Sequence, residues 1–176
     1  MEMYNIKPAQ KVGILIDVQN IYHSAKNLYQ ARVNFHELIK TITGRGQLIK
    51  VLAYVIKSDP ATGEEYFFEA LRKSGIELRV KELQVYPDGT KKGDWDVGLA
   101  IDAIRLASSL DVLILVTGDG DFIPLVQYLK WGLGKDIKIV GFSHTTSAKL
   151  KEVADDFLEI ESIPKVLLKI SQRKKK

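Results

Sequence analysis

The stretch VLILVTGDGDF, residues 112–122, joins five apolar residues to a turn that carries two carboxylates. A short, continuous apolar run is typical of a parallel strand that is buried on both faces. Gly118 and Gly120 allow the backbone to turn sharply after the strand, so that a helix can follow. The sequence therefore predicts that Asp119 and Asp121 lie at a strand-to-helix junction.

The same pattern occurs near the N-terminus, in VGILIDVQN, residues 12–20. It predicts an apolar strand over 12–16 that ends at Asp17, and a helix that Asn20 helps to cap. In an open parallel sheet the functional crevice lies beyond the carboxyl ends of the strands. Asp17 and Asp119 are both predicted at such ends, so we expect them at the same edge of the sheet.

Strands and helices alternate along the rest of the chain. Further strands are predicted over residues 48–56, 76–85, 136–142 and 157–160. Helices are predicted over residues 20–29, 35–42, 62–73, 95–110, 122–131, 148–154 and 164–170. This alternation predicts an α/β fold, a three-layer α/β/α sandwich with a mostly parallel central sheet. We expect one domain over 1–162, followed by a C-terminal helix and a basic tail over 163–176.

The composition limits the chemistry. With 176 residues, the chain has about the right length for one domain with a full hydrophobic core. It contains no cysteine, which excludes disulfides, thiolate catalysis and a Cys-ligated zinc site. It contains only three histidines, so a histidine-rich metal site is not expected either. A bound metal ion would therefore be a hard one that prefers oxygen ligands.

Hydropathy and charge bear on the compartment of the protein and on the type of partner it binds. No run approaches the roughly 18 apolar residues of a membrane span, and the N-terminus lacks the apolar core of a signal peptide, so we expect a cytoplasmic protein. The net charge of +4 and the pI near 9.1 favour an anionic partner modestly. Much of the excess charge lies in the terminal run from Arg173 to Lys176.

A third acidic segment, KKGDWDVGLAIDA over 91–103, opens the predicted helix 95–110. Asp96 lies near the helix start, whereas Asp94 is expected to face solvent or to cap the helix. Asp102 lies about 120° around the helix from Asp96, in a stretch that is apolar nearly all round and is expected to be buried. A buried Asp102 must be paired, and we expect it to hold the Asp17 loop or a lysine.

Three of these carboxylates also have a structural alternative. Asp17 could be only a turn or cap residue, and Asp96 could serve only to complement the helix dipole. Asp121 is well placed to cap the helix that follows it, whereas Asp119 has no such evident use. The two tryptophans, Trp95 and Trp131, fall at apolar helical positions and are expected in the core.

Polar residues on two further loops could contact phosphate. Lys92 could lean over the crevice, or it could be an ordinary solvated lysine. After the strand 136–142, Ser143 or Thr146 could touch a phosphate, whereas Ser147 is expected to cap a helix. His144 on the same loop could act as an acid or base, although an isolated histidine at such a rim is more often only exposed.

The three acidic segments together resemble the NYN domain of the LabA group. The motifs are DVQN at 17–20, KGDWDV at 92–97 leading to Asp102, and TGDGDF at 117–122. They occur in order within about residues 11–160, nearly the whole chain. The resemblance implies a PIN-like fold and an acidic cluster that binds Mg²⁺ or Mn²⁺ for the hydrolysis of RNA.

Transferred position by position, the resemblance implies a catalytic and metal-binding set of four aspartates: Asp17, Asp96, Asp119 and Asp121. Asn20 lies beside them as a substrate contact, and Asp102 is the helix acid of the motif. Thr117 stands where the family usually has serine and keeps the hydroxyl. The residue between Gly93 and Trp95 is itself acidic, so the sequence leaves open whether Asp94 or Asp96 faces the metal.

These observations predict a metal-dependent ribonuclease that acts on single-stranded RNA, with Asn20, Lys92 and Ser143 as substrate contacts. The alternative is a non-catalytic RNA-binding or regulatory NYN module. A haloacid-dehalogenase-type phosphatase would need Asp-x-Asp after the first strand, where this chain has Asp17-Val18-Gln19. A dinucleotide-binding domain would need Gly-x-Gly-x-x-Gly there. A homodimer is a further expectation, because apolar residues over 166–170 could pack on the body or on a partner chain.

Overall fold

A six-stranded parallel sheet forms the centre of the molecule. The structure is a computed structural model, and it describes residues 5–57 and 64–170. The strand order is β4-β3-β1-β7-β8-β9, and each of these pairings is parallel. The strands are β1 (Lys11–Asp17), β3 (Gln47–Lys57), β4 (Glu77–Glu82), β7 (Val112–Val116), β8 (Asp136–Gly141) and β9 (Asp156–Glu159).

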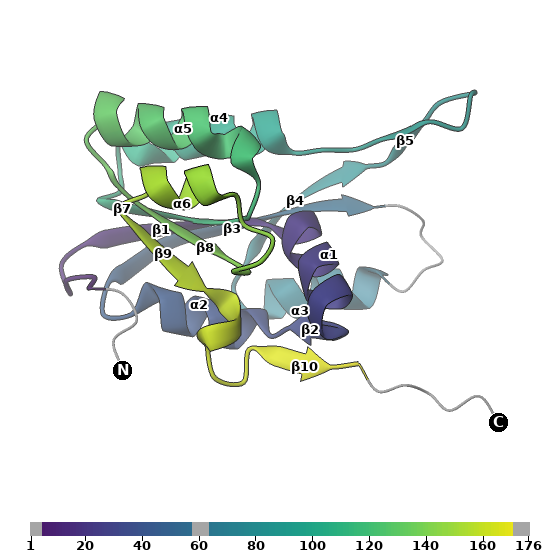
Figure 1. Ribbon diagram of the computed structural model, residues 1–176, viewed down its shortest axis with the longest axis horizontal. Coiled ribbons are helices and arrows are strands. Elements are labelled where there is room, and N and C mark those ends of the chain that lie inside the picture. Colours follow the sequence, from purple (N-terminus) through teal and green to yellow (C-terminus); the bar gives the residue numbers. More distant parts are fainter. Residues whose placement is uncertain (1–4, 58–63, 171–176) are drawn as a thin grey trace.

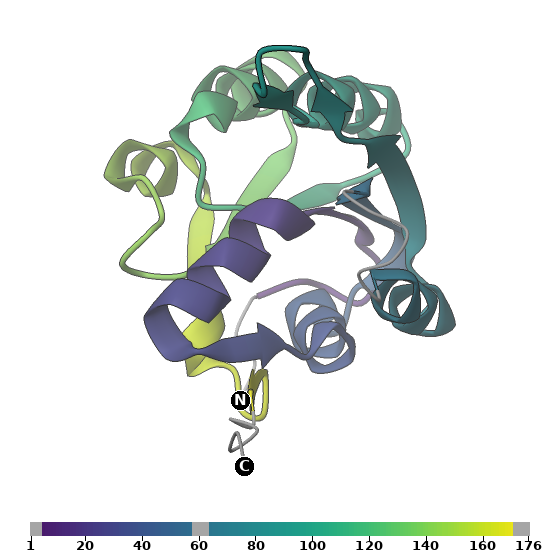
Figure 2. The ribbon, with the colours of Figure 1, turned by 90° about the vertical axis from the view of Figure 1, so that its right-hand side faces the viewer.

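Helices cover both faces of this sheet (Figures 1 and 2). One face carries α1 (Val18–Tyr29), α2 (Phe35–Thr43) and α3 (Glu64–Lys73), and the other carries α4 (Asp96–Ala107), α5 (Ile123–Gln127) and α6 (Ala148–Val153). The predicted three-layer α/β/α sandwich is confirmed. Among the described residues, no helix is both long and apolar enough to cross a membrane.

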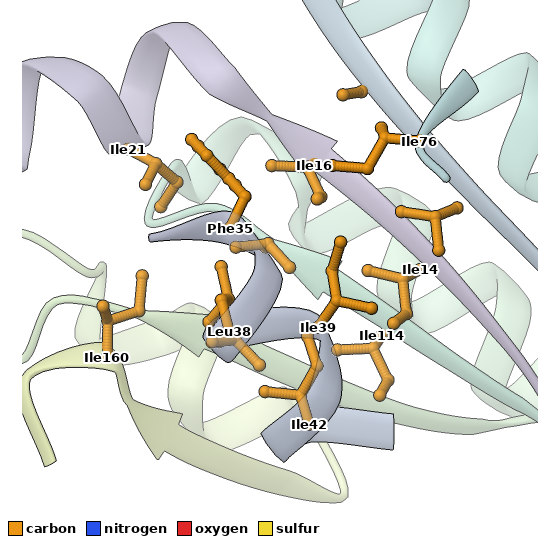
Figure 3. Close-up of a cluster of buried hydrophobic side chains, with 14 of the residues drawn as sticks. Ile14, Ile16, Ile21, Phe35, Leu38, Ile39, Ile42, Ile76, Ile114 and Ile160 are labelled. Atoms are coloured by element: carbon orange, nitrogen blue, oxygen red, sulfur yellow. The ribbon is translucent and has the colours of Figure 1, made fainter. Parts of the chain in front are cut away.

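The strands bury side chains on both of their faces, as the continuous apolar runs predicted. Along β1, Ile14 and Ile16 point toward the layer of α1, α2 and α3, whereas Leu15 points toward the layer of α4 and α5. On α2, apolar residues at helical spacing form one buried stripe: Phe35, Leu38, Ile39 and Ile42. Figure 3 shows this stripe against Ile14 and Ile114 of the sheet.

The strand order reverses direction at β1. From β1 the chain proceeds to β3 and β4 on one side, and β7, β8 and β9 follow on the other side. The point between β1 and β7 is therefore the topological switch point of the sheet, where crossover helices leave toward opposite faces and open a crevice. Asp17 ends β1 and Thr117 follows β7, so the acidic turns lie at this crevice.

The expected helix over 164–170 is wrong. Leu167–Lys169 form a strand, β10, which pairs antiparallel with β2 (Ala31–Val33). Lys165 adopts a positive φ of 61°, which interrupts any helix there, and β2 offers an unpaired edge. Residues 167–169 are therefore paired with the body through β2. A homodimer stays a prediction.

Two other expectations concern segments outside the described residues. The basic run from Arg173 to Lys176 is one of them. The start of the predicted helix 62–73 is the other. Within the described part of the chain, α3 begins at Glu64.

The expectation that helix 95–110 is buried all round is wrong. Leu99, Ala103 and Ala107 of α4 are buried against the sheet, but Val97 and Ile101 on its outer face are 71% and 51% exposed. A helix in the outer layer contacts the sheet through only one stripe, whatever the polarity of its other face. Trp131, expected in the core, is 68% exposed for the same reason.

The burial of the central strands can be tested by truncation. Ile114→Ala removes a fully buried side chain from β7 and should lower the free energy of unfolding by about 2–5 kcal/mol. Ile101→Ala, on the outer face of α4, should change it by about 0.5 kcal/mol or less. Urea denaturation of both variants measures the difference. Equal losses would contradict the assignment of the two faces.

Candidate metal centre

A cleft of about 360 Å³ opens at the carboxyl ends of β1 and β7. Four acids, Asp17, Asp94, Asp96 and Asp119, are among its lining residues, together with Asn20. They come from three parts of the chain: the end of β1, the start of α4 and the turn after β7. The fold therefore brings together acids that are up to about a hundred residues apart in sequence.

Three carboxylates in and beside this cleft are spaced for one cation. Asp96, Asp119 and Asp121 each offer an oxygen, and these oxygens lie within 4.8 Å of one another. Carboxylate oxygens are the ligands that hard divalent cations prefer. Asp96 belongs to this group of three carboxylates, and Asp94 does not.

The surroundings of Asp96 make its negative charge costly. Burial raises the pKa of Asp96 above its ordinary value, and the charges of Asp119, Asp94 and Asp121 raise it further. Like charges at this spacing favour either protonation or a counter-ion. The donor set and its mutual repulsion therefore fit a divalent cation.

Asp17 lies beside the triad, and the protein already engages both of its oxygens. Its Oδ1 accepts a hydrogen bond from the Asn20 backbone N–H at 3.2 Å, which caps α1, and its Oδ2 accepts one from the Thr117 hydroxyl at 3.1 Å. Burial raises the pKa of Asp17; the two hydrogen bonds oppose this rise, and the charges of Asp96 and Asp119 add to it.

A chain of hydrogen bonds joins the end of β1 to the turn after β7. The Asn20 side-chain oxygen accepts from the Gly118 N–H at 2.9 Å, and the Thr117 hydroxyl accepts from the Asp119 N–H at 3.2 Å. Asn20 thus bridges the two loops, and the expectation that it caps the helix is wrong, because Asp17 does so. The two loops are held as one unit.

The turn after β7 also differs from expectation. The Asp119 carboxylate accepts from the Asp121 N–H at 2.9 Å, so Asp119, and not Asp121, caps the single 3-10 turn before α5. Gly118 does not adopt a positive φ. A Cβ at Gly118 would lie 2.9 Å from the Thr145 carbonyl oxygen, so this glycine is required for close approach of two loops.

The start of α4, which carries Asp96, is anchored to the sheet through Trp95. The indole N–H donates to the Val55 carbonyl oxygen at 2.9 Å, and the ring packs edge-on against Tyr54 with centroids 5.5 Å apart. The Lys81 ammonium lies 5.3 Å from the Trp95 ring centroid and donates to the Asp94 carbonyl oxygen at 2.9 Å. These contacts fix the position of Asp96 relative to β3.

Asp102 is paired, as expected for a carboxylate in an apolar stretch of helix, but its partners differ from those expected. Its Oδ2 accepts from the Tyr54 hydroxyl at 3.0 Å and from the Arg79 Nε at 3.1 Å. The expectation that it holds the Asp17 loop or a lysine is wrong. Burial raises the pKa of Tyr54, and the charge of Asp102 raises it further, so the hydroxyl stays a donor. Asp102 thereby ties α4 to β3 and β4.

Two predicted substrate contacts lie apart from the described lining of the cleft. Lys92 lies on β6 (Lys91–Lys92), which pairs with β5 (Gln84–Val85) in an exposed hairpin that extends from the body (Figure 1). Ser143 donates from its backbone N–H and its hydroxyl to Glu161 Oε1, at 2.9 and 2.6 Å. His144 is exposed on the same loop.

One wall of the cleft was missed from the sequence except for Asn20. The polar face of α1 supplies Gln19, His23, Ser24 and Asn27 beside Asn20, and these residues recur at helical spacing. That periodicity was readable, but a polar helix face is ordinarily the solvated one, so it gave no reason to place the other four residues at a site. Only the packing of α1 beside the β7 turn makes this face a wall.

The match to a known family covers most of the chain. The NYN domain matches residues 11–161, from the start of β1 into the segment after β9. The chain belongs to the NYN family. This family is part of the PIN-like nuclease superfamily, and the three clustered aspartates lie within the matched region.

Similar proteins have been found at the level of sequence and of structure. The chain is 23% identical over 156 residues to an uncharacterised protein of Methanocaldococcus jannaschii, covering 88% of this chain and 57% of that protein. It is 23% identical over 123 residues to the low amplitude and bright protein LabA of Synechococcus elongatus, covering 66% of this chain and 65% of that protein. It thus spans less than two thirds of either relative.

A crystal structure of a Vibrio parahaemolyticus protein of unknown function has the same fold. It superimposes with a TM-score of 0.84 at 33% sequence identity, covering 94% of this chain and 100% of that chain. The shared architecture therefore extends beyond the acidic turns to nearly the whole molecule.

The hydroxyl of Thr117 should be needed to hold Asp17. Thr117→Val leaves a half-buried carboxylate oxygen and the Asp119 N–H without their partner, and should lower the free energy of unfolding by about 1–3 kcal/mol at neutral pH. Thr117→Ser keeps the hydroxyl and should retain most of the stability. Urea denaturation of the two variants compares them.

The loss should also depend on pH. Without the Thr117 donor, the folded-state pKa of Asp17 rises further above its unfolded value, so ionisation costs more stability above that pKa. The difference between Thr117→Val and Thr117→Ser should therefore shrink as the pH falls and Asp17 takes up its proton. A difference that grows toward acidic pH would contradict this account of Asp17.

Proposed function

We propose that the protein is a metal-dependent ribonuclease that hydrolyses phosphodiester bonds of single-stranded RNA. The observation that carries the proposal is the convergence of Asp96, Asp119 and Asp121, within 4.8 Å of one another, at the switch-point crevice of an NYN domain. A crevice at this position is where open α/β sheets bind their ligands. Among the described residues, no lysine, arginine or histidine forms an ion pair with these three acids, so a structural ion-pair network does not explain them.

We propose Mg²⁺ or Mn²⁺ as the cofactor, because the triad offers only carboxylate oxygens and the chain has no cysteine. Such a cation, when bound, supplies Lewis acidity toward the scissile phosphate and the attacking water. Asp96, Asp119 and Asp121 would hold it. Asp17, whose oxygens are occupied by Asn20 and Thr117, keeps the two loops in register and adds negative potential to the site.

The neighbouring residues would position the RNA. Asn20 lines the cleft beside the acids, and we propose that its side-chain amide contacts the RNA there. Lys92 lies on the exposed β5–β6 hairpin, and we propose that it contacts the RNA backbone outside the cleft. Ser143 already gives both of its donors to Glu161, so we assign it to holding its own loop.

Cleavage of single-stranded RNA with Mn²⁺ tests the proposal. Asp119→Asn should lower the cleavage rate by on the order of 100-fold or more, the size of loss caused by removing one electrostatic group from an active site. Asp156→Asn is the matched control, because Asp156 is exposed at the start of β9, at the opposite edge of the sheet. This control should cleave at the wild-type rate.

Equal cleavage by wild type and Asp119→Asn would refute the mechanism. RNA binding without any metal-dependent cleavage by the wild type would favour a non-catalytic RNA-binding module instead.

Cation binding should be visible without RNA. Mn²⁺ at about 100 times its dissociation constant should stabilise the wild type by about 2.7 kcal/mol, which raises the melting temperature by about 5–11 °C. Asp96→Asn should lose this gain. Without Mn²⁺ the variant should melt no lower than the wild type, because the pKa of Asp96 is raised and its charge is unfavourable in the fold.

Differential scanning calorimetry with and without Mn²⁺ measures both effects. An identical Mn²⁺ gain in Asp96→Asn and in the wild type would remove Asp96 from the metal site.

A further inference from the structure

A second and larger groove lies next to the acidic cleft. Its volume is about 810 Å³, against about 360 Å³ for the cleft. It runs between α1, the start of α2 and α3, whose arrangement is visible in Figure 2. Gln19, His23 and Ile56 line both the groove and the cleft, so the two form one continuous depression. A ligand held at the triad can therefore extend into the groove.

The groove presents aromatic rings that the fold leaves uncovered. Tyr22 on α1 is 42% exposed and Tyr66 on α3 is 87% exposed, and both line it. The Tyr22 ring packs edge-on against His23, with centroids 5.6 Å apart, which supports the ring from one side. Exposed aromatic faces of this kind are the stacking platforms on which proteins bind the bases of single-stranded nucleic acids.

The charge of the depression changes between its two parts. The cleft is lined by four acids, whereas Glu64 is the one acid among the described residues that line the groove, alongside Arg32, His23 and His36. The Lys26 ammonium also lies 5.9 Å from the Tyr22 ring centroid. A polyanion is therefore disfavoured in the cleft without a cation. The described lining of the groove lacks this excess of acids, and Arg32, with Lys26 beside Tyr22, offers cationic partners for the flanking phosphates.

The shared wall defines a path between the two parts. Gln19 and His23 are four residues apart on α1, and Tyr22 is three residues from Gln19, so all three lie on adjoining strips of one helix surface. A nucleotide next to the scissile phosphate would cross this wall. Its base would then meet Tyr22, and the bases that follow would meet Tyr66 across the groove.

We propose that this groove is a base-stacking subsite for the single-stranded RNA that flanks the scissile phosphate. Tyr22 and Tyr66 supply the stacking faces, and Arg32 and Lys26 accompany the backbone. Because stacking accepts every base, the subsite selects unpaired strands over duplexes rather than one sequence. This inference rests on the proposed function and extends it by naming how the substrate is held.

Binding can be measured separately from cleavage. Fluorescence anisotropy with a labelled eight-nucleotide uridine RNA, in EDTA and on the Asp119→Asn background, reports affinity when no hydrolysis occurs. Adding Tyr22→Ala or Tyr66→Ala should weaken binding by about tenfold or more, as expected for the loss of one stacked base. Tyr22→Phe and Tyr66→Phe keep the ring and should bind like the background protein.

Two controls separate stacking from other causes. Tyr128→Ala removes a 50%-exposed tyrosine next to α5, on the other face of the sheet, and should leave the affinity unchanged. An abasic RNA of the same length keeps the phosphates but lacks the bases. It should bind weakly to the background protein and lose little more affinity on Tyr22→Ala.

Equal affinity of the alanine variants and the Tyr128→Ala control, or equal binding of the abasic and normal RNAs, would overturn the subsite. Metal-dependent cleavage that persists in that case would leave the proposed ribonuclease standing. Conversely, tyrosine-dependent binding by a wild type that never cleaves RNA would support the groove and refute the nuclease.

Discussion

The arrangement of the site depends on holding repelling carboxylates together at the ends of two adjacent parallel strands. Asp17 ends β1, and Asp119 lies in the turn after β7. The hydrogen bonds from Thr117 to Asp17 and from Gly118 to Asn20 connect these two turns directly. Since the sheet fixes the strands and the hydrogen bonds fix the turns, the acids cannot separate to relieve their repulsion. A cation can relieve it without moving the backbone.

The start of α4, which carries Asp96, is held in place by other contacts. Asp96 lies on α4, across the depression from the β1 turn, and the helix is secured by aromatic packing and by charge. Trp95 connects its start to β3, and Asp102 connects its middle to Tyr54 and Arg79. A Cβ at Gly98 would lie 2.6 Å from the Trp95 ring, so a glycine at that position is what lets the ring lie against the helix. Asp102 thus holds α4, the helix that carries Asp96, against β3 and β4.

In the function proposed here, the two depressions would divide the recognition of RNA between them. The acidic cleft would hold a cation and, through it, one phosphate, and its acids would repel a phosphate that arrives without that cation. The neighbouring groove has exposed aromatic faces, and its described lining holds one arginine, Arg32, and one acid, Glu64. A strand held in both would be bound chiefly through the groove and cut at the cleft, which separates affinity from chemistry along one continuous surface of α1.

The sequence by itself determined the layered α/β fold and the acidic turns, because buried strands and their terminal aspartates are local patterns of hydropathy and charge. It also predicted Asp102 as paired, since a carboxylate on an apolar helix must find a partner. Only the tertiary structure decided which partner, which of Asp94 and Asp96 joins the triad, that Asp119 caps its own turn, and that residues 167–169 form a strand. Those outcomes depend on contacts between segments far apart in the chain, and local patterns carry no information about which segments meet.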